Sequence, residues 1–166
     1  MSTTTQVRVR RAGRIDLKDA VTLFEAELAG APAEWLAWDE EEHHRLTGFV
    51  ASLLVMPYVA AFIAYAGSEP IGQCMVQVFS RPYGKPRLVA EGLTWYVTPE
   101  HRGGWVASDL YRHGEAFALA CGAKIFELPL RPEGLIRKCE AMGYQRITTR
   151  LWMAATGTQE VTDGGG

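Results

Sequence analysis

The sequence predicts an α+β fold: a three-layer α/β sandwich in which one mixed, mostly antiparallel sheet is flanked by helices. Three observations predict it. Apolar residues recur with strand and helix periods in the order β-α-α-β-β-β-α-β-α-β. No repeat or linker divides the 166 residues, so a single core is expected. Hydrophobic residues make up 48% of the chain, which is enough to build that core.

The first part of the chain supplies a strand and two helices. Residues 7–10 alternate apolar and basic side chains, as a strand does. Asp16 is a candidate N-cap for a helix that follows it. The apolar face of that helix comprises Leu17, Ala20, Val21, Phe24 and Leu28. A loop over residues 30–39, with Trp35 and Trp38, leads to a second helix over residues 40–56, which Pro57 ends.

The stripe of this second helix is formed by Leu46, Phe49, Val50 and Leu53. Acidic residues 39–42 lie at its start, where negative charge interacts favourably with the helix dipole. The same residues could instead form an acidic lip, that is, a negatively charged rim of a binding site, which attracts a cationic amine.

The rest of the chain alternates strands and helices. Strands over residues 59–66 and 71–79 are joined by a turn, and a second turn over 81–86 leads to a long strand over 87–97. A helix over 106–121 ends before Gly122. A short strand over 124–128, a helix over 132–142 and a last strand over 144–153 complete the sheet. One domain over residues 7–153 is therefore expected, with flexible tails over 1–6 and 154–166.

Composition excludes several classes of protein. The formal net charge is −2 and no basic block is present, so no nucleic-acid partner is expected. The four histidines show no metal-ligand spacing, so no metal is expected. Three cysteines without a CxxC motif indicate free thiols. The start of the chain has no signal-peptide core and the longest apolar-rich run is broken by Pro57, so we expect a cytoplasmic protein without a membrane partner.

The most informative segment joins the long strand to the helix that begins at Val106. Pro99 cannot continue a strand ladder, and Gly103 and Gly104 lead directly into the helix. The first N–H groups of a helix have no intrahelical partner, and the helix dipole adds positive potential there. With Arg102 alongside, this pattern predicts an anion site for a phosphate group. The alternative is a plain strand–turn–helix connection in which the glycines only make the turn.

The segment Val-Thr-Pro-Glu-His-Arg-Gly-Gly at residues 97–104 resembles the pyrophosphate loop of the GNAT superfamily of acetyl-CoA-dependent N-acetyltransferases. The family pattern is Gln/Arg-x-x-Gly-x-Gly/Ala. Arg102 matches its first position and Ala107 its last, whereas Trp105 stands where the middle glycine is expected. Branches with Arg-Gly-Gly followed by a non-glycine exist, some in bacterial viruses. In such a branch the Trp105 side chain must point away from the ligand.

A second segment supports the resemblance. Cys-Glu-Ala-Met-Gly-Tyr at residues 139–144 is similar to the family's Tyr-Glu-Lys-Leu-Gly-Phe signature, and the order of elements matches from Val7 to Met153. The resemblance implies that an amine attacks the thioester of acetyl-CoA directly, without a covalent enzyme intermediate and without a metal.

The resemblance also implies which residues bind acetyl-CoA. The backbone N–H groups of the loop would bind the pyrophosphate; they belong to Arg102, Gly103, Gly104, Trp105, Val106 and Ala107. The end of the long strand would pair with the pantetheine amides; it comprises Trp95, Tyr96 and Val97. An N–H group of that strand would polarise the thioester carbonyl.

Two residues are candidates for proton transfer. Alternation places Glu91 on the same strand face as Val89, Leu93, Trp95 and Val97. Some family members hold a glutamate base eleven positions before the first residue of the loop motif, and Glu91 lies at that distance before Arg102. A salt bridge or a substrate-binding charge is the alternative for Glu91. Cys139 stands where many members place a tyrosine, so its thiol could protonate the leaving thiolate. Alternatively, Cys139 is a small buried apolar residue and water acts as the acid.

The resemblance leaves several functions open. The first is acetyl transfer to a primary amine of a small molecule, peptide or protein. The second is a catalytically inactive acyl-CoA-binding, regulatory or assembly module, which the departures at Trp105 and Cys139 suggest. The third is an unrelated α/β domain with a chance glycine loop. Homodimers are common in the family, so a homodimer is one expectation. The acceptor cannot be read from the sequence, because this fold serves many amines.

Overall fold

The computed structural model describes residues 6–30, 39–80, 88–127, 137 and 140–141. The elements follow the order β1 (Val7–Arg11), η1 (Arg14–Asp16), α1 (Leu17–Leu28), α2 (Glu40–Leu53), β2 (Val59–Ala66), β3 (Glu69–Ser80), β4 (Leu88–Val97), η3 (Pro99–His101), α3 (Val106–Ala120) and β5 (Ile125–Glu127). Residues 1–129 form one compact unit. Beyond it, residues 137, 140 and 141 are helical. The single domain over 7–153 stays a prediction.

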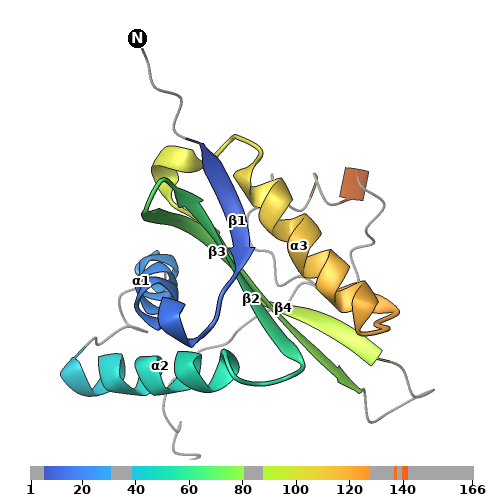
Figure 1. The fold of residues 1–166 in the computed structure, drawn as a ribbon, viewed down its shortest axis with the longest axis horizontal. Helices are drawn as coiled ribbons and strands as arrows, with labels where there is room; N and C mark the ends of the chain where they lie inside the picture. The colour runs from blue at the N-terminus through green and yellow to red at the C-terminus, as the bar shows by residue number, and fades with distance from the viewer. Residues whose placement is uncertain (1–5, 31–38, 81–87, 128–136, 138–139, 142–166) are drawn as a thin grey trace, which may run out of the picture. The chain divides into compact units, whose positions relative to one another are not determined.

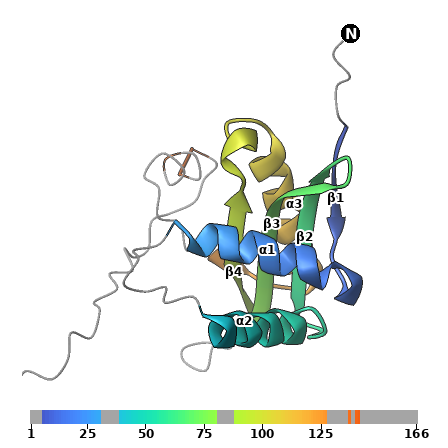
Figure 2. The ribbon, with the colours of Figure 1, turned by 90° about the vertical axis from the view of Figure 1, so that its left-hand side faces the viewer.

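The sheet has the strand order β1-β2-β3-β4-β5 (Figure 1). The first four strands pair antiparallel, and β5 joins β4 in parallel. Helices α1 and α2 lie on one face of the sheet and α3 on the other, as Figures 1 and 2 show together. This arrangement confirms the predicted α+β sandwich with a mixed, mostly antiparallel sheet. None of the helices in the described ranges is long and apolar enough to cross a membrane.

A buried core lies on each face of the sheet. Towards α3, Leu110 of the helix packs with Val76 of β3 and Ala90 of β4. Towards α1 and α2, Leu23 and Val50 pack with residues of β2 and β3. The predicted helix stripes are largely confirmed, but Leu23 was missed. The side chain of Phe49 is 50% exposed, and its ring makes an edge-to-face contact with Phe24.

Two helix ends differ from the sequence prediction. Helix α2 ends at Leu53 rather than at Met56, because the N–H groups of Val55 and Met56 donate to carbonyls three residues back and tighten the chain into turns. Helix α3 ends at Ala120, and Gly122 follows with a φ of +81°, the left-handed conformation that glycine adopts at helix ends.

The two predicted helix starts have different outcomes. Asp39 caps α2, since its carboxylate accepts the N–H of Glu42 at 2.9 Å. The side chains of Glu41 and Glu42 both pair with Arg45 on the same helix, which favours the helix-start interpretation over an acidic lip. Helix α1 does begin directly after Asp16, but the Asp16 carboxylate does not cap it.

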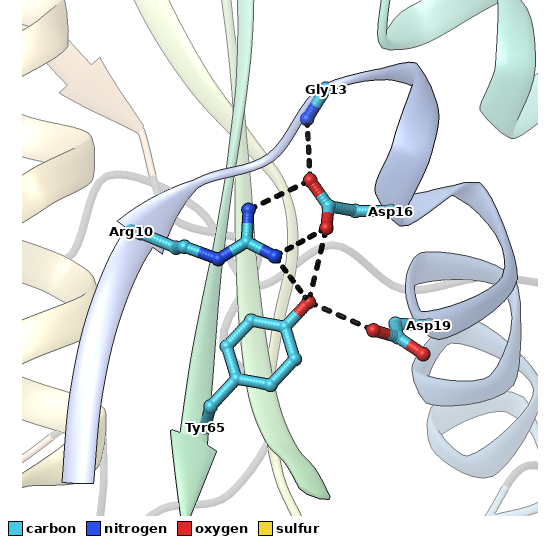
Figure 3. Close-up of polar contacts among 5 residues, drawn as sticks. All are labelled: Arg10, Gly13, Asp16, Asp19 and Tyr65. Atoms are coloured by element: carbon cyan, nitrogen blue, oxygen red, sulfur yellow. Dashed lines mark hydrogen bonds and ion pairs between the residues drawn. The ribbon is translucent and has the colours of Figure 1, made fainter. Parts of the chain in front are cut away.

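Asp16 instead joins β1 to α1 through a partly buried polar network (Figure 3). Its carboxylate accepts hydrogen bonds from both terminal nitrogens of Arg10 and from the N–H of Gly13. Tyr65 of β2 completes the network by donating to Asp19 at 2.9 Å. Asp16 is the last residue of η1, with φ −96° and ψ 8° instead of the extended backbone typical of an N-cap, so its carboxylate bonds to Arg10 and Gly13 and the predicted cap is not formed.

Strand β4 contains an extra residue relative to its neighbour. Val76 of β3 lies opposite Gly92, but Met75 lies opposite Thr94, so Leu93 forms a β-bulge. A bulge reverses the inward and outward alternation of the residues that follow it. This shift decides which side chains of β4 share a face.

Candidate active site

The structure confirms that a strand, a turn and a helix follow one another in this segment, as both interpretations of the glycines require. Strand β4 ends at Val97, the 3-10 helix η3 follows, and α3 begins at Val106. Gly103 has a φ of +85°, which a residue with a side chain rarely adopts. An added Cβ at Gly104 would meet no atom within 4 Å. The turn is therefore open to solvent in front of both glycines.

The backbone N–H groups of the turn are available to an anion. Among the residues that the structure describes, no hydrogen bond uses the N–H groups of Gly103 to Ala107. The N–H of Arg102 differs from the others of the expected set, because it donates to the carbonyl of Pro99 at 3.3 Å. The donor set and the open glycines fit a diphosphate at the start of a helix.

The Arg102 side chain attaches the turn to the sheet. Its Nε donates to the carbonyl of Val97 at 2.9 Å, and its guanidinium lies 5.6 Å from the centre of the Tyr96 ring. The positive charge thus stays beside the glycines, as the sequence suggested. Arg102 also has a structural role that the sequence did not reveal, since it anchors the turn to the last residue of β4.

Trp105 stands at the N-cap position of α3, and its side chain is 54% exposed. The side chain of Trp105 is therefore accommodated at the surface and not in the hydrophobic core. The orientation of its side chain relative to a bound ligand stays a prediction.

Within the described residues, one edge at the end of β4 has no partner strand. Strand β5 pairs with β4 only from Val89 to Glu91. Beyond Glu91, residues 92–97 pair with β3 on one side, and the described part of the chain places no strand on the other. The predicted pantetheine-binding residues, 95–97, lie on this edge. An extended ligand with amide groups could add to it as a further strand.

The predicted face of Glu91 is wrong in part. Glu91 shares a face with Val89 and Leu93, but the bulge turns Trp95 and Val97 towards α3, where both pack with the core of that face. Glu91 lies on the face of α1 and α2, opposite Gln77 of β3. Its neighbours across the strands are therefore polar, which the sequence pattern did not indicate.

Glu127 is a candidate that the sequence analysis missed. It lies directly opposite Glu91 in the parallel β4–β5 pair, so the two carboxylates start from the same face of the sheet. The available signal was a charged residue directly after the two apolar residues of a short strand, Ile125 and Phe126. The register of β5 against β4 could not be read from the sequence.

Several of the remaining predicted residues lie outside the described residues. They are Cys139, Trp35, Trp38 and, apart from the helical residues 140 and 141, the signature over 139–144. Cys74 lies on the α3 face and is 1% exposed, and burial raises the pKa of its thiol to about 12. A thiol of this kind is structural rather than reactive.

Comparison with known proteins shows a family match. The model of the acetyltransferase (GNAT) family matches residues 18–134, which is more than half of the chain and includes the whole turn. No curated protein matches the sequence at a significant level.

Several solved structures share the fold. A predicted acetyltransferase from Clostridium acetobutylicum, solved with acetyl-CoA, has a TM-score of 0.74 and 16% identity, covering 90% of this chain and 97% of that one. A transcriptional regulator from Bacillus halodurans C-125 has a TM-score of 0.73 and 16% identity, covering 90% and 99%. An aminoglycoside N-acetyltransferase in complex with CoA has a TM-score of 0.70 and 18% identity, covering 93% and 97%. At these identities the likeness shows the fold alone.

Proposed function

The chain belongs to the acetyltransferase (GNAT) family, and on that premise we propose that it transfers the acetyl group of acetyl-CoA to a primary amine. The observation that carries this proposal is the connection from Val97 to Val106. It presents amide N–H groups at the start of a 15-residue helix, where an anion gains most from the helix dipole. The guanidinium of Arg102 adds a full positive charge beside them.

The residues present can hold both parts of CoA. The backbone of Gly103 to Ala107 would bind the diphosphate, and the unpaired edge of β4 over residues 95–97 would orient the pantetheine amides. Acetyl-CoA would supply the thioester, which is an activated acyl group. An amide N–H of the same edge would stabilise negative charge on the acyl oxygen, as an oxyanion hole does.

Glu91 and Glu127 would act on the amine. A primary amine with a pKa of ~10.4 is almost wholly protonated at neutral pH, so it must lose a proton before it can attack. Glu91 would accept that proton on its carboxylate. Glu127, directly across the β4–β5 pair, would add a second negative charge that favours a cationic acceptor.

The class of acceptor follows from this charge. We propose a small molecule or peptide that carries a primary ammonium group, and the aminoglycoside N-acetyltransferase with the same fold supports a polyamine-like acceptor. Cys139 remains the candidate that protonates the departing thiolate, with water as the alternative.

A panel of amines tests the proposal. The protein is mixed with acetyl-CoA and a polyamine, an aminoglycoside, an amino acid or a peptide, and both free thiol and acetylated amine are measured. We expect acetylation of at least one cationic amine. Retained CoA binding with no acetylated product would contradict transfer and indicate the acyl-CoA-binding module instead.

Two isosteric variants assign the roles. Glu91→Gln removes a base and should lower kcat by about 10²- to 10⁴-fold while the affinity for CoA is kept. Glu127→Gln removes only a neighbouring charge and should raise KM for the amine with little loss of kcat. Full activity of Glu91→Gln at neutral pH would exclude Glu91 as the base.

A further inference from the structure

The side chain of Trp95 makes an unexpected contact. The sequence analysis gave Trp95 a role through its backbone, on the pantetheine-binding edge of β4. In the structure its indole N–H also donates to the carbonyl of Ala107 at 3.0 Å. Ala107 lies in the first turn of α3, directly after the glycine turn. One residue therefore joins the strand edge to the start of the helix.

This hydrogen bond is the second of two that flank the glycines. Before them, the Arg102 side chain donates to the carbonyl of Val97 at 2.9 Å. After them, Ala107 accepts from Trp95. Gly103 and Gly104 thus lie between two attachments to the same end of β4. Both glycines have open space around them, so these two attachments, rather than packing of the glycines themselves, tie this part of the turn to β4.

The position of the indole is fixed by neighbouring rings. The Trp95 ring lies 5.5 Å from Tyr111 of α3, and Tyr111 lies 5.6 Å from Phe126 of β5. Contacts of this kind between aromatic rings restrict the side-chain rotamers. They hold the indole N–H where it reaches Ala107.

We propose that Trp95 is a positioning residue that sets the distance between the diphosphate-binding turn and the pantetheine-binding edge of β4. The inference rests on the proposed function. CoA joins a diphosphate and a pantetheine at a fixed covalent length, so both parts bind well only if their two sites are held at the matching distance. A side chain that belongs to one site and bonds to the other provides that constraint.

A ligand that uses one site only should not depend on Trp95. The variant Trp95→Phe keeps an aromatic ring beside Tyr111 but removes the N–H donor. We expect its affinity for CoA to fall by about 3- to 10-fold, the usual effect of losing one hydrogen bond. Its affinity for pantetheine, which lacks the diphosphate, should stay within about twofold of the wild type, since the strand edge is unchanged.

The matched control is Tyr111→Phe. It changes the same group of rings but removes only a hydroxyl that bonds to Glu115 on the same helix. CoA affinity is measured by calorimetry, and pantetheine affinity by NMR titration, which reads weak binding. Thermal unfolding of each variant shows that it is folded. Tyr111→Phe should bind both ligands as the wild type does.

The outcomes separate the inference from the proposed function. Unchanged CoA binding by Trp95→Phe, or an equal loss for CoA and pantetheine, would overturn the positioning role while the proposed function stands. A wild type that binds no CoA would instead overturn the proposed function. If Trp95→Phe does not fold, 3-benzothienylalanine at position 95 keeps the shape of the indole and removes only the N–H, and the same two outcomes apply.

Discussion

Asp16 shows how one side chain can depend on a partner that the sequence does not reveal. The carboxylate is 4% exposed, and the Arg10 guanidinium, followed by the N–H of Gly13, holds its pKa below the ordinary value of 3.8. A carboxylate with a lowered pKa stabilises the folded state above its unfolded-state pKa. That contribution is lost as the pH falls through the lower, folded-state pKa. Burial raises the pKa of Tyr65, so its hydroxyl stays protonated and continues to donate to Asp19.

The variant Asp16→Asn tests this dependence. It should lower the free energy of unfolding at neutral pH by about 1–3 kcal/mol, because Arg10 loses a charged acceptor. The difference from the wild type should shrink as the pH falls below 3.8, the unfolded-state pKa, towards the lower pKa at which the folded wild-type carboxylate is protonated. Urea unfolding across acid and neutral pH measures it. Asp19→Asn is the control, since an amide oxygen still accepts from Tyr65, and a pH-independent difference for Asp16→Asn would contradict the account.

Glu91 marks the limit of sequence reasoning at the same scale. Its place on a long strand before the glycine turn was predictable from alternation. Its face relative to Trp95 was not, because Leu93 forms a bulge that no residue pattern announces. Glu127 was missed for a related reason, since the pairing of two strands far apart in the sequence depends on the whole sheet.

At the scale of elements, α3 lies so close to β3 that one glycine is required. A Cβ added at Gly114 would come within 2.8 Å of Val76 Cγ2 and 3.1 Å of the Cys74 sulphur. Glycine is a poor helix former, so the close approach, rather than helix stability, explains this residue. The helix that carries the glycine turn is thereby held against the centre of the sheet.

A pair of alanine substitutions separates the two effects. Gly114→Ala should destabilise the protein, because overpacking costs about 1–3 kcal/mol and exceeds the gain of about 1 kcal/mol in helix propensity. Gly48→Ala lies on the exposed side of α2, where an added Cβ meets no atom within 4 Å, and should stabilise by about 1 kcal/mol. Chemical denaturation of both measures the difference. Equal stabilisation by the two substitutions would show that α3 does not need the close contact.

Element boundaries were predictable where a single residue controls them. Gly122 ends α3 because it adopts a positive φ, and Pro99 prevents β4 from continuing. The end of α2 was not predictable, since turns over 54–56 keep the apolar pattern while the helix has already ended. The predicted cap of α1 is not formed because Asp16 belongs to η1 and lacks the extended backbone of an N-cap.

At the scale of the whole molecule, the candidate site follows from one topological feature. Strand β5 pairs in parallel with β4 for only three residues, and the rest of β4 keeps a free edge within the described ranges. The glycine turn begins where that edge ends. A strand edge and the proposed anion site at one end of one strand would together suit a ligand that is a pseudo-peptide at one end and a phosphate ester at the other. The order of elements along the chain and the mixed, mostly antiparallel sheet were predicted from the sequence, whereas the short β4–β5 pairing was not.

Calorimetric titration of acetyl-CoA into the wild type and two variants at position 104 tests the central claim most directly. Gly104 has open space for a side chain and a φ outside the positive region, so Gly104→Asp and Gly104→Asn both fit the fold. They have nearly the same shape and differ in one negative charge at the proposed diphosphate site. We predict micromolar binding by the wild type and about 10- to 100-fold weaker binding by the aspartate than by the asparagine variant. No affinity in the wild type, or equal affinities of the two variants, would contradict a diphosphate on this turn.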